Sequence, residues 1–158
     1  MSETPLTIAL RPKSLDEIIG QHHLLADDKP LRRMVKTNKF QSCIVSGPPG
    51  TGKTSLVRAL ASETTSVFRP LNATSAKVAE LRAIIKNAEK VKEERKTFVF
   101  VDEIHRWSKS QQDVLLPHVE DGTIILFGAT TENPKFAINS TILSVSYTHL
   151  TLPTILLV

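Results

Sequence analysis

One stretch of the sequence has glycines, a lysine and a threonine at the spacing of a phosphate-binding loop. It matches the pattern G-x-x-x-x-G-K-[ST] and consists of Gly47, Pro48, Pro49, Gly50, Thr51, Gly52, Lys53 and Thr54. Glycines let backbone N–H groups approach phosphate oxygens, because no Cβ stands in the way. We expect Lys53 to reach the β- and γ-phosphates and to assist catalysis, and the Thr54 hydroxyl to hold Mg²⁺. The stretch predicts a site for a nucleoside triphosphate with Mg²⁺.

A pair of acidic residues is the second feature that could do chemistry. Asp102 and Glu103 follow residues 97–101, a run with the composition of a strand buried on both faces. Ligands of open α/β sheets bind at the carboxyl ends of the strands, so Asp102 is expected to share the Mg²⁺ with Thr54. Glu103 is then placed to orient and activate an attacking water molecule. The pair predicts hydrolysis of the nucleotide rather than binding alone.

A third polar group follows the apolar run at 123–127. Thr130, Thr131 and Asn133 come shortly after it. If this strand lies between the phosphate-loop strand and the strand at 97–101, its carboxyl end points at the γ-phosphate. We predict that Thr131 senses that phosphate or the lytic water, with Thr130 and Asn133 behind it. The alternative is an ordinary turn rich in Thr and Asn.

The elements that must position these residues alternate along the chain. Strands are predicted over residues 42–46, 66–71, 97–101 and 123–127. Helices are predicted over residues 14–19, 30–37, 53–63, 76–94 and 108–118. Ser14 and Glu17 have the spacing of a capping box for the first helix. The alternation predicts an α/β fold, a parallel sheet with helices on both faces.

The composition narrows the class of protein. The 158 residues are 41% hydrophobic and 23% charged, which is enough for one domain with a core. Aromatic residues make up 5%, which argues against a platform that stacks nucleic-acid bases. The net charge of +4 permits contact with nucleic acid without establishing it. The single cysteine, Cys43, excludes an intramolecular disulfide and is expected in the core.

The sequence also carries expectations about location. The chain starts with Ser2-Glu3-Thr4-Pro5 after Met1, which is unlike a signal peptide. No apolar run has the length of a membrane-spanning helix. We therefore expect a cytoplasmic protein without a membrane partner.

The order of these features resembles the AAA+ group of P-loop NTPases, a three-layer sandwich. Three longer stretches resemble a narrower family: 10–25 (LRPKSLDEIIGQHHLL), 102–124 (DEIHRWSKSQQDVLLPHVEDGTI) and 128–134 (GATTENP). They are similar to the replication-associated recombination protein A family, also called MgsA, whose eukaryotic relative is the Werner helicase interacting protein. The resemblance covers about residues 5–144, and Trp107 stands where that family usually has Phe.

The resemblance implies an ATPase with Mg²⁺ that acts on DNA at stalled replication forks, in replication, recombination and repair. It implies single-stranded ends or gaps as targets, single-strand-binding protein as a partner, and a homo-oligomer that lies near the nucleoid in a bacterium. Three alternatives stay open: a clamp-loader-like ATPase, a Holliday-junction-motor-like ATPase, and a nucleotide-dependent recruitment module with little catalysis. A small-molecule phosphotransferase is disfavoured, because no second substrate pocket is indicated.

The resemblance also implies roles for residues outside the phosphate loop. It places four residues around the adenine: Arg11, Pro12, Ile19 and Gly20. It further implies that Asn72 couples Glu103 to bound DNA. The basic residues look scattered, without a Lys/Arg stripe on a predicted helix, so no DNA contact is assigned to a residue.

We divide the chain into an adenine-side segment with short helices (1–40), a nucleotide-binding core (41–144) and a tail (145–158). The resemblance ends at Val145, where the family has an arginine finger that reaches the ATP of a neighbouring subunit. No Asp, Glu, Lys or Arg occurs in the 23 residues after Lys135. We interpret the tail as foreign sequence, joined to a truncated core by a cloning step or an unrelated reading frame.

This interpretation has consequences for activity and stability. The lid domain, the oligomerisation region and the arginine finger would be absent, and such a finger contributes about 10³–10⁵ in rate elsewhere. The chain alone is then expected to bind ATP weakly and to hydrolyse it poorly. The edge of the sheet beside the phosphate-loop strand is expected to lack a partner strand.

Overall fold

The computed structural model describes residues 12–18, 25–133 and 148–151. In this part of the chain five strands form one sheet, in the order β2-β3-β4-β1-β5, and all neighbouring strands are parallel. The strands are β1 (Cys43–Ser46), β2 (Val67–Asn72), β3 (Thr97–Asp102), β4 (Ile125–Thr130) and β5 (Thr148–Thr151). Strand β4 therefore lies between β3 and β1, which is the condition on which the predicted role of Thr131 depends, so these three strands end at one edge of the sheet.

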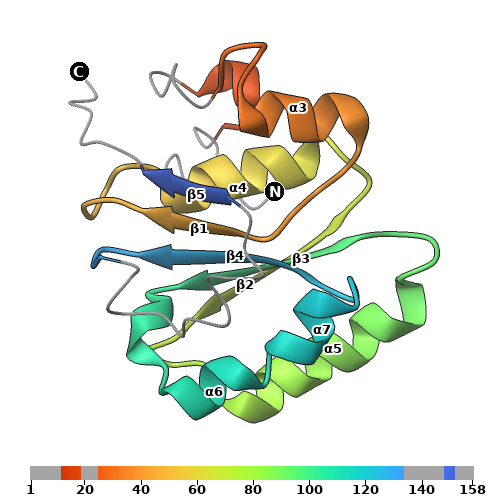
Figure 1. The fold of residues 1–158 in the computed structure, drawn as a ribbon, viewed down its shortest axis with the longest axis vertical. Coiled ribbons are helices and arrows are strands. Elements are labelled where there is room, and N and C mark those ends of the chain that lie inside the picture. Colours follow the sequence, from red (N-terminus) through yellow and green to blue (C-terminus); the bar gives the residue numbers. More distant parts are fainter. Residues whose placement is uncertain (1–11, 19–24, 134–147, 152–158) are drawn as a thin grey trace, which may run out of the picture.

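Helices cover both faces of this sheet, as Figure 1 shows. The described helices are η1 (Leu15–Glu17), α3 (Pro30–Thr37), α4 (Lys53–Ser62), α5 (Val78–Val91), η2 (Ile104–Arg106), α6 (Lys109–Asp113) and α7 (Leu116–Glu120). Helices α3 and α4 lie on one side, and α5, α6 and α7 lie on the other. The predicted three-layer α/β sandwich is confirmed. None of the described helices has the length and apolar character needed to cross a membrane.

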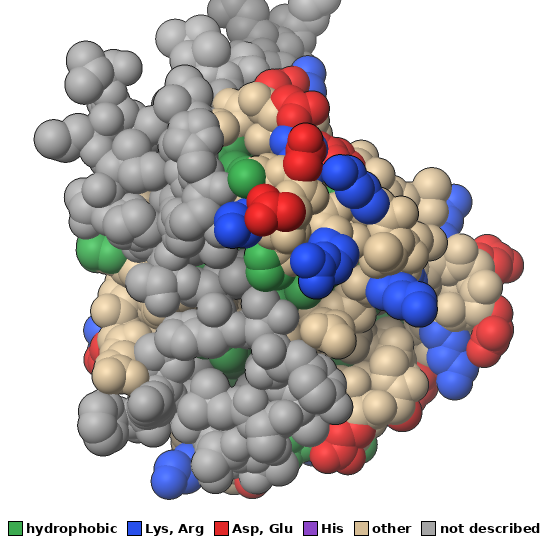
Figure 2. All heavy atoms as spheres, turned by 45° about the horizontal axis from the view of Figure 1, so that its top comes forward, with side chains coloured by type: hydrophobic (Ala, Val, Ile, Leu, Met, Phe, Trp, Pro, Cys, Tyr) green, Lys and Arg blue, Asp and Glu red, His purple; other side chains and the backbone are tan. Residues whose placement is uncertain are grey.

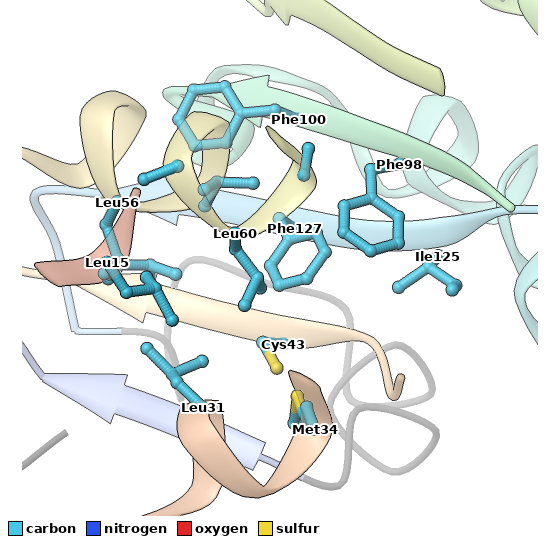
Figure 3. Packing of buried hydrophobic residues seen from close by; sticks show 14 of the residues in the cluster. Leu15, Leu31, Met34, Cys43, Leu56, Leu60, Phe98, Phe100, Ile125 and Phe127 are labelled. Carbon is cyan, nitrogen blue, oxygen red and sulfur yellow. The ribbon is translucent and has the colours of Figure 1, made fainter. Parts of the chain in front are cut away.

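The core on the α4 side is built from phenylalanines of the sheet and leucines of the helices (Figure 3). The rings of Phe98 and Phe127 lie 5.2 Å apart, and both residues are fully buried. Leu60 of α4 and Leu31 of α3 pack into the same cluster. Cys43 is buried here as well, which confirms its predicted place in the core.

A second core lies on the opposite face of the sheet. Helix α5 contributes Leu81 and Ile85, which pack with Val99 and Val101 of β3 and with Trp107. Burying such side chains contributes about 1.5–3 kcal/mol each. The two cores hold the sheet from both sides and thereby fix where β1, β3 and β4 end.

Strand β4 runs three residues further than the sequence indicated, because Gly128 continues it. A Cβ at Gly128 would lie 3.0 Å from the Ile44 and Ile104 side chains, so the close packing there needs glycine. Thr130 is consequently the last residue of the buried strand rather than part of a turn. Of the three predicted residues, Thr131 and Asn133 follow the strand and are exposed.

The helix predicted at 108–118 is two short helices, α6 and α7. Pro117 is at the second position of α7, and its nitrogen has no hydrogen to donate to the carbonyl of Asp113, four residues earlier. Ser108 caps α6 by a capping box with Gln111 that was not predicted. The proline therefore divides a continuous amphipathic pattern.

The capping box predicted at Ser14 is wrong. The Ser14 side chain caps nothing, and Glu17 instead accepts a hydrogen bond from the N–H of Lys13 at 2.8 Å. The N–H of Leu15 donates to Glu63, at the end of α4, at 2.6 Å. A carboxylate distant in sequence thus binds the first N–H of this turn, the N–H of Glu17 donates to the Ser14 carbonyl at 3.3 Å, and η1 is a single 3-10 turn.

The two edges of the sheet differ from each other. The prediction of an unpaired edge beside β1 is wrong, because β5 pairs with β1 from Cys43 opposite Thr148 to Ser46 opposite Thr151. The opposite edge is β2, where Pro70 is exposed. A proline is tolerated on an edge strand because it has no N–H to give to a neighbouring strand.

Candidate active site

The phosphate loop connects β1 to α4 and requires glycine at two positions. Gly50 and Gly52 have φ angles of 75° and 84°, in the left-handed region that other residues rarely adopt. The N–H of Gly47 donates to the carbonyl of Thr130 at 3.1 Å, which ties the start of the loop to the end of β4. The backbone N–H of Leu56 donates to the carbonyl of Gly52 at 2.9 Å. The N–H groups that precede Leu56 at the start of α4 therefore have no acceptor within the helix. The start of α4 is therefore suited to bind an anion.

The Lys53 ammonium lies within the curve of this loop. It donates to the carbonyls of Gly47 at 2.9 Å and Pro48 at 2.8 Å, and the residue is 8% exposed. Burial lowers the pKa of Lys53, and the negative charges of Asp102 and Glu103 oppose that shift. The lysine is thus held beside the two acids whose charges favour its protonated form.

The three predicted groups meet around one open cleft of about 440 Å³. Its lining residues are Pro49, Gly50, Thr51, Gly52, Lys53, Thr54, Ser55, Asp102, Glu103 and Thr131. This volume falls within the range of about 300–1,000 Å³ that is usual for small-molecule sites. The structure thereby brings together the loop, the acidic pair and Thr131, as the sequence predicted.

The donors in this cleft fit a magnesium–nucleotide complex. The Thr54 hydroxyl and the Asp102 carboxylate are oxygen ligands of the type that Mg²⁺ prefers. Among the described residues, no group of three or more His, Cys, Asp or Glu side chains is arranged to hold a metal ion. Mg²⁺ commonly combines one or two protein ligands with phosphate oxygens and water, so a nucleotide would complete its shell.

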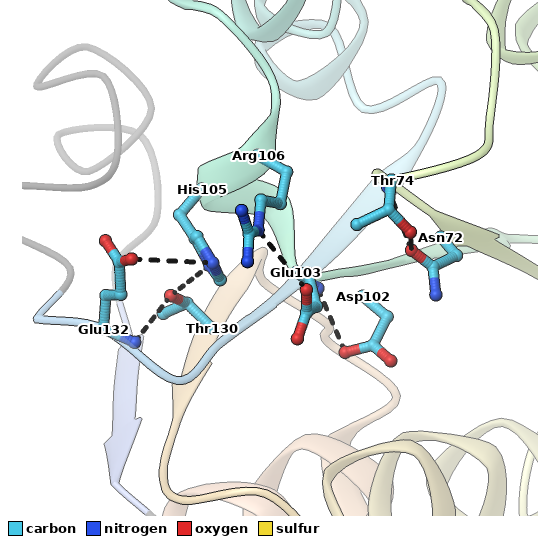
Figure 4. Close-up of polar contacts among 8 residues, drawn as sticks. All are labelled: Asn72, Thr74, Asp102, Glu103, His105, Arg106, Thr130 and Glu132. Carbon is cyan, nitrogen blue, oxygen red and sulfur yellow. Dashed lines mark hydrogen bonds and ion pairs between the residues drawn. The ribbon is translucent and has the colours of Figure 1, made fainter.

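The acidic pair has an unusual backbone conformation. Glu103 has a φ of 53°, which is uncommon for a residue with a side chain. The Glu103 N–H donates to the Asp102 carboxylate at 3.0 Å, and Arg106 Nε lies 3.6 Å from the Glu103 carboxylate (Figure 4). Uncommon backbone conformations concentrate at functional sites, where the surrounding structure holds them. The bend directs Glu103 into the cleft that Asp102 also lines.

Sequence reasoning assigned no role to His105, which links the acidic pair to the end of β4 (Figure 4). Its side chain is 5% exposed, and its Nδ1 lies 2.9 Å from Thr130 Oγ1. The N–H of Glu132 also donates to that hydroxyl, at 3.0 Å. Because the Thr130 carbonyl accepts from Gly47, one threonine joins the phosphate loop to the turn that carries Glu103. The predicted role of Thr130 behind Thr131 is therefore refined: Thr130 is buried and bonded to His105.

We predict that His105→Ala lowers kcat for ATP roughly tenfold with a smaller effect on KM, because the acidic pair and Thr131 lose their common support. His105→Asn retains a polar atom near the Nδ1 position and should recover part of kcat. Steady-state ATPase assays of the intact protein measure both constants, and thermal unfolding shows whether the variants fold. An Ala variant with the kcat of the wild type would contradict the positioning role.

The remaining predicted site residues are not brought together in this way. Pro12 is half-buried and does not line the cleft, while Arg11, Ile19 and Gly20 lie outside the described residues. Their contacts with adenine stay predictions. Asn72 Oδ1 accepts a hydrogen bond from the Thr74 N–H at 2.9 Å (Figure 4). The coupling of Asn72 to Glu103 and DNA also stays a prediction.

The fold and this cleft agree with a family match. The family described as "ATPase family associated with various cellular activities (AAA)" matches residues 43–151, more than half of the chain. The chain belongs to this AAA family of ATPases. The match includes β5, which lies in the tail that we interpret as foreign; the origin of that tail stays a hypothesis.

Within that family the chain matches the AAA domain of replication-associated recombination protein A. The protein of that name from Escherichia coli K12 is 48% identical over 141 residues, which is 89% of this chain and 32% of the relative. The protein named ATPase WRNIP1 from Dictyostelium discoideum is 42% identical over 144 residues, 90% of this chain and 16% of the relative. The resemblance inferred from the sequence is confirmed, although the chain spans about a third of the first of these relatives.

A solved structure supports the same fold. The Thermotoga maritima RuvB Holliday junction branch migration motor has a TM-score of 0.71 and 32% sequence identity. The alignment covers 90% of this chain and 48% of that chain. The predicted P-loop AAA fold is therefore confirmed.

Proposed function

We propose that the intact protein hydrolyses ATP and uses it to act on DNA at stalled replication forks. The observation that carries the proposal is the single cleft in which Lys53, Thr54, Asp102, Glu103 and Thr131 converge. A phosphate site alone would suit any nucleotide-binding protein. The acid that follows Asp102 adds a group able to accept a proton from water.

Each residue has a separate task in this reaction. The N–H groups at the start of α4 and the Lys53 ammonium bind the β- and γ-phosphates and stabilise the charge that develops on them. Thr54 and Asp102 would hold Mg²⁺, which neutralises phosphate charge. Glu103 takes a proton from the water whose oxygen attacks the γ-phosphorus, while the bond to the oxygen of ADP breaks. Thr131 is placed at the same cleft to position that water or the γ-phosphate.

The sequence identities to the relatives favour action at replication forks over the activities of the alternative motors. Identity is 48% to the E. coli replication-associated recombination protein A and 32% to the T. maritima Holliday junction motor. We therefore prefer fork-associated recombination and repair to branch migration or clamp loading. The proposal includes single-stranded ends or gaps as DNA targets, single-strand-binding protein as a partner, assembly into a homo-oligomer and a cytoplasmic location.

An ATPase assay of the full-length protein with and without single-stranded DNA tests this function. We expect hydrolysis in the presence of Mg²⁺ and a higher rate when single-stranded DNA is added. Blunt duplex DNA of equal nucleotide concentration is the control. Hydrolysis without any response to DNA would overturn the DNA-directed part, and absence of hydrolysis would overturn the enzyme assignment.

A further inference from the structure

Helix α5 has an exposed basic face that the chemistry of the cleft does not use. The helix packs against the sheet through Leu81, Ile85 and Ala88. Its exposed side carries Arg82, Lys86 and Lys90 at intervals of four residues. Residues four apart lie on one side of a helix, about 6 Å apart along its axis. We call these three residues the α5 basic face, and they correct our sequence-based interpretation that no helix has such a stripe.

The positive charges of this face have no ion-pair partner among the residues that the structure describes. Within the described part of the chain, no carboxylate pairs with Arg82, Lys86 or Lys90. The nearest candidate in sequence is Glu89, whose carboxylate lies 3.9 Å from His118 Nδ1 on α7. Because that acid lies near another helix, the described part of the chain leaves the three cations available to an external anion.

Helix α3 provides a contrast on the opposite face of the sheet. Lys29 lies 3.3 Å from Asp28, Lys36 lies 3.7 Å from Asp27, and Arg32 pairs with Asp16. On the face that carries this helix, basic and acidic side chains are intermixed (Figure 2). Lys29, Arg32 and Lys36 therefore have carboxylate partners, unlike the three cations of α5.

The neighbours of the three cations indicate which kind of partner fits. Ala79, Ala83 and Asn87 lie beside them on the exposed side of α5 and are small and uncharged, and the exposed acid between Lys86 and Lys90, Glu89, is the one that lies near His118. Protein partners usually require an aromatic or large apolar anchor at the centre of the interface, and this face has none. A nucleic-acid backbone requires regularly placed cations instead, because phosphates are its main points of contact.

We propose that the α5 basic face binds the phosphate backbone of a DNA strand. The inference rests on the proposed action on DNA and specifies its contact surface. The face lies on the side of the sheet opposite α3 and α4, so a bound strand would run along the α5–α7 layer.

The test measures DNA affinity of the intact protein as a function of salt concentration. A fluorescent single-stranded oligonucleotide is titrated with wild type and with the triple variant Arg82→Gln, Lys86→Gln, Lys90→Gln. Each phosphate contact on a single strand contributes about 0.7 to the slope of log affinity against log salt concentration, so we expect a slope smaller by about 2. We also expect about a tenfold weaker Kd at low salt. The matched control is Arg33→Gln, Lys36→Gln, Lys39→Gln on and beside α3, which removes the same charge.

Each result has a defined meaning. Weaker binding and a smaller slope for the α5 variant alone, with an unchanged Tm, support the inference. Equal losses in both triple variants, or no loss in the α5 variant, overturn it while the proposed function stands. If wild type does not bind DNA and its ATPase does not respond to it, the proposed function itself fails. Binding of an acidic peptide by the α5 face in place of the oligonucleotide would overturn the inference in favour of a protein partner.

Discussion

Replacing Glu103 by Gln is expected to lower ATP turnover by about 10²–10⁴-fold in the intact protein, with little change in the Kd for ATP. The amide has nearly the shape of the carboxylate, but it does not accept a proton from water. The backbone N–H of residue 103 can still donate to Asp102, so the bend in the chain should persist. Single-turnover hydrolysis and titration with a fluorescent ATP analogue measure the two quantities.

A matched control separates the chemistry from the loss of one negative charge. Glu80→Gln makes the same change on the exposed surface of α5 and should leave turnover and the Kd for ATP unaltered. Turnover by Glu103→Gln within a factor of three of wild type would rule out Glu103 as the base. The same variant tests the recruitment alternative, since a module that uses ATP only to assemble should still act at forks when hydrolysis is blocked.

Lys53→Ala is expected to weaken ATP binding by about 10–100-fold, and turnover should fall with it. Hydrogen bonds to charged groups contribute about 1.5–3 kcal/mol, and about 1.4 kcal/mol corresponds to a tenfold change in affinity. The variant also removes the bonds from Lys53 to the carbonyls of Gly47 and Pro48, so the loop should become less ordered. Nucleotide titration and hydrogen exchange of residues 47–54 measure these effects.

The control for this prediction is Lys109→Ala, which removes an exposed lysine outside the cleft. It should retain the Kd of the wild type for ATP. If Lys53→Ala bound ATP as tightly as wild type and stayed folded, then the N–H groups at the start of α4 would bind the phosphates without the lysine.

Features that depend on nearby residues could be predicted from the sequence. The loop at 47–54 combines its glycines, lysine and threonine in one short stretch, and its strand and helix flank it directly. Asp102 and Glu103 follow a buried strand, and parallel strands end at a common edge, so their approach to Lys53 was predictable. Alternation of strands and helices then gave the layers of the fold.

Features that depend on distant residues could not be predicted in this way. The N–H of Glu17 donates to the Ser14 carbonyl rather than to its side chain, and Glu63, far along the chain, accepts the bond from Leu15. His105 is bonded to Thr130, the last residue of β4, a strand that continues through Gly128 where the glycine packs closely against Ile44. The pairing of β5 with β1 joins segments separated by most of the domain. The division of the predicted helix at Pro117 is an exception. It could have been predicted, because the proline is visible in the sequence.

The left-handed backbone of Glu103 bears on how this domain can be engineered. A residue with a side chain in that conformation costs roughly 1–2 kcal/mol, whereas asparagine and glycine adopt it more readily. A search for more stable variants would therefore favour replacing Glu103, although it is the residue we assign to proton transfer. Selection for activity keeps a glutamate that selection for stability would remove. Thermostabilised versions of this domain should be screened with position 103 held constant.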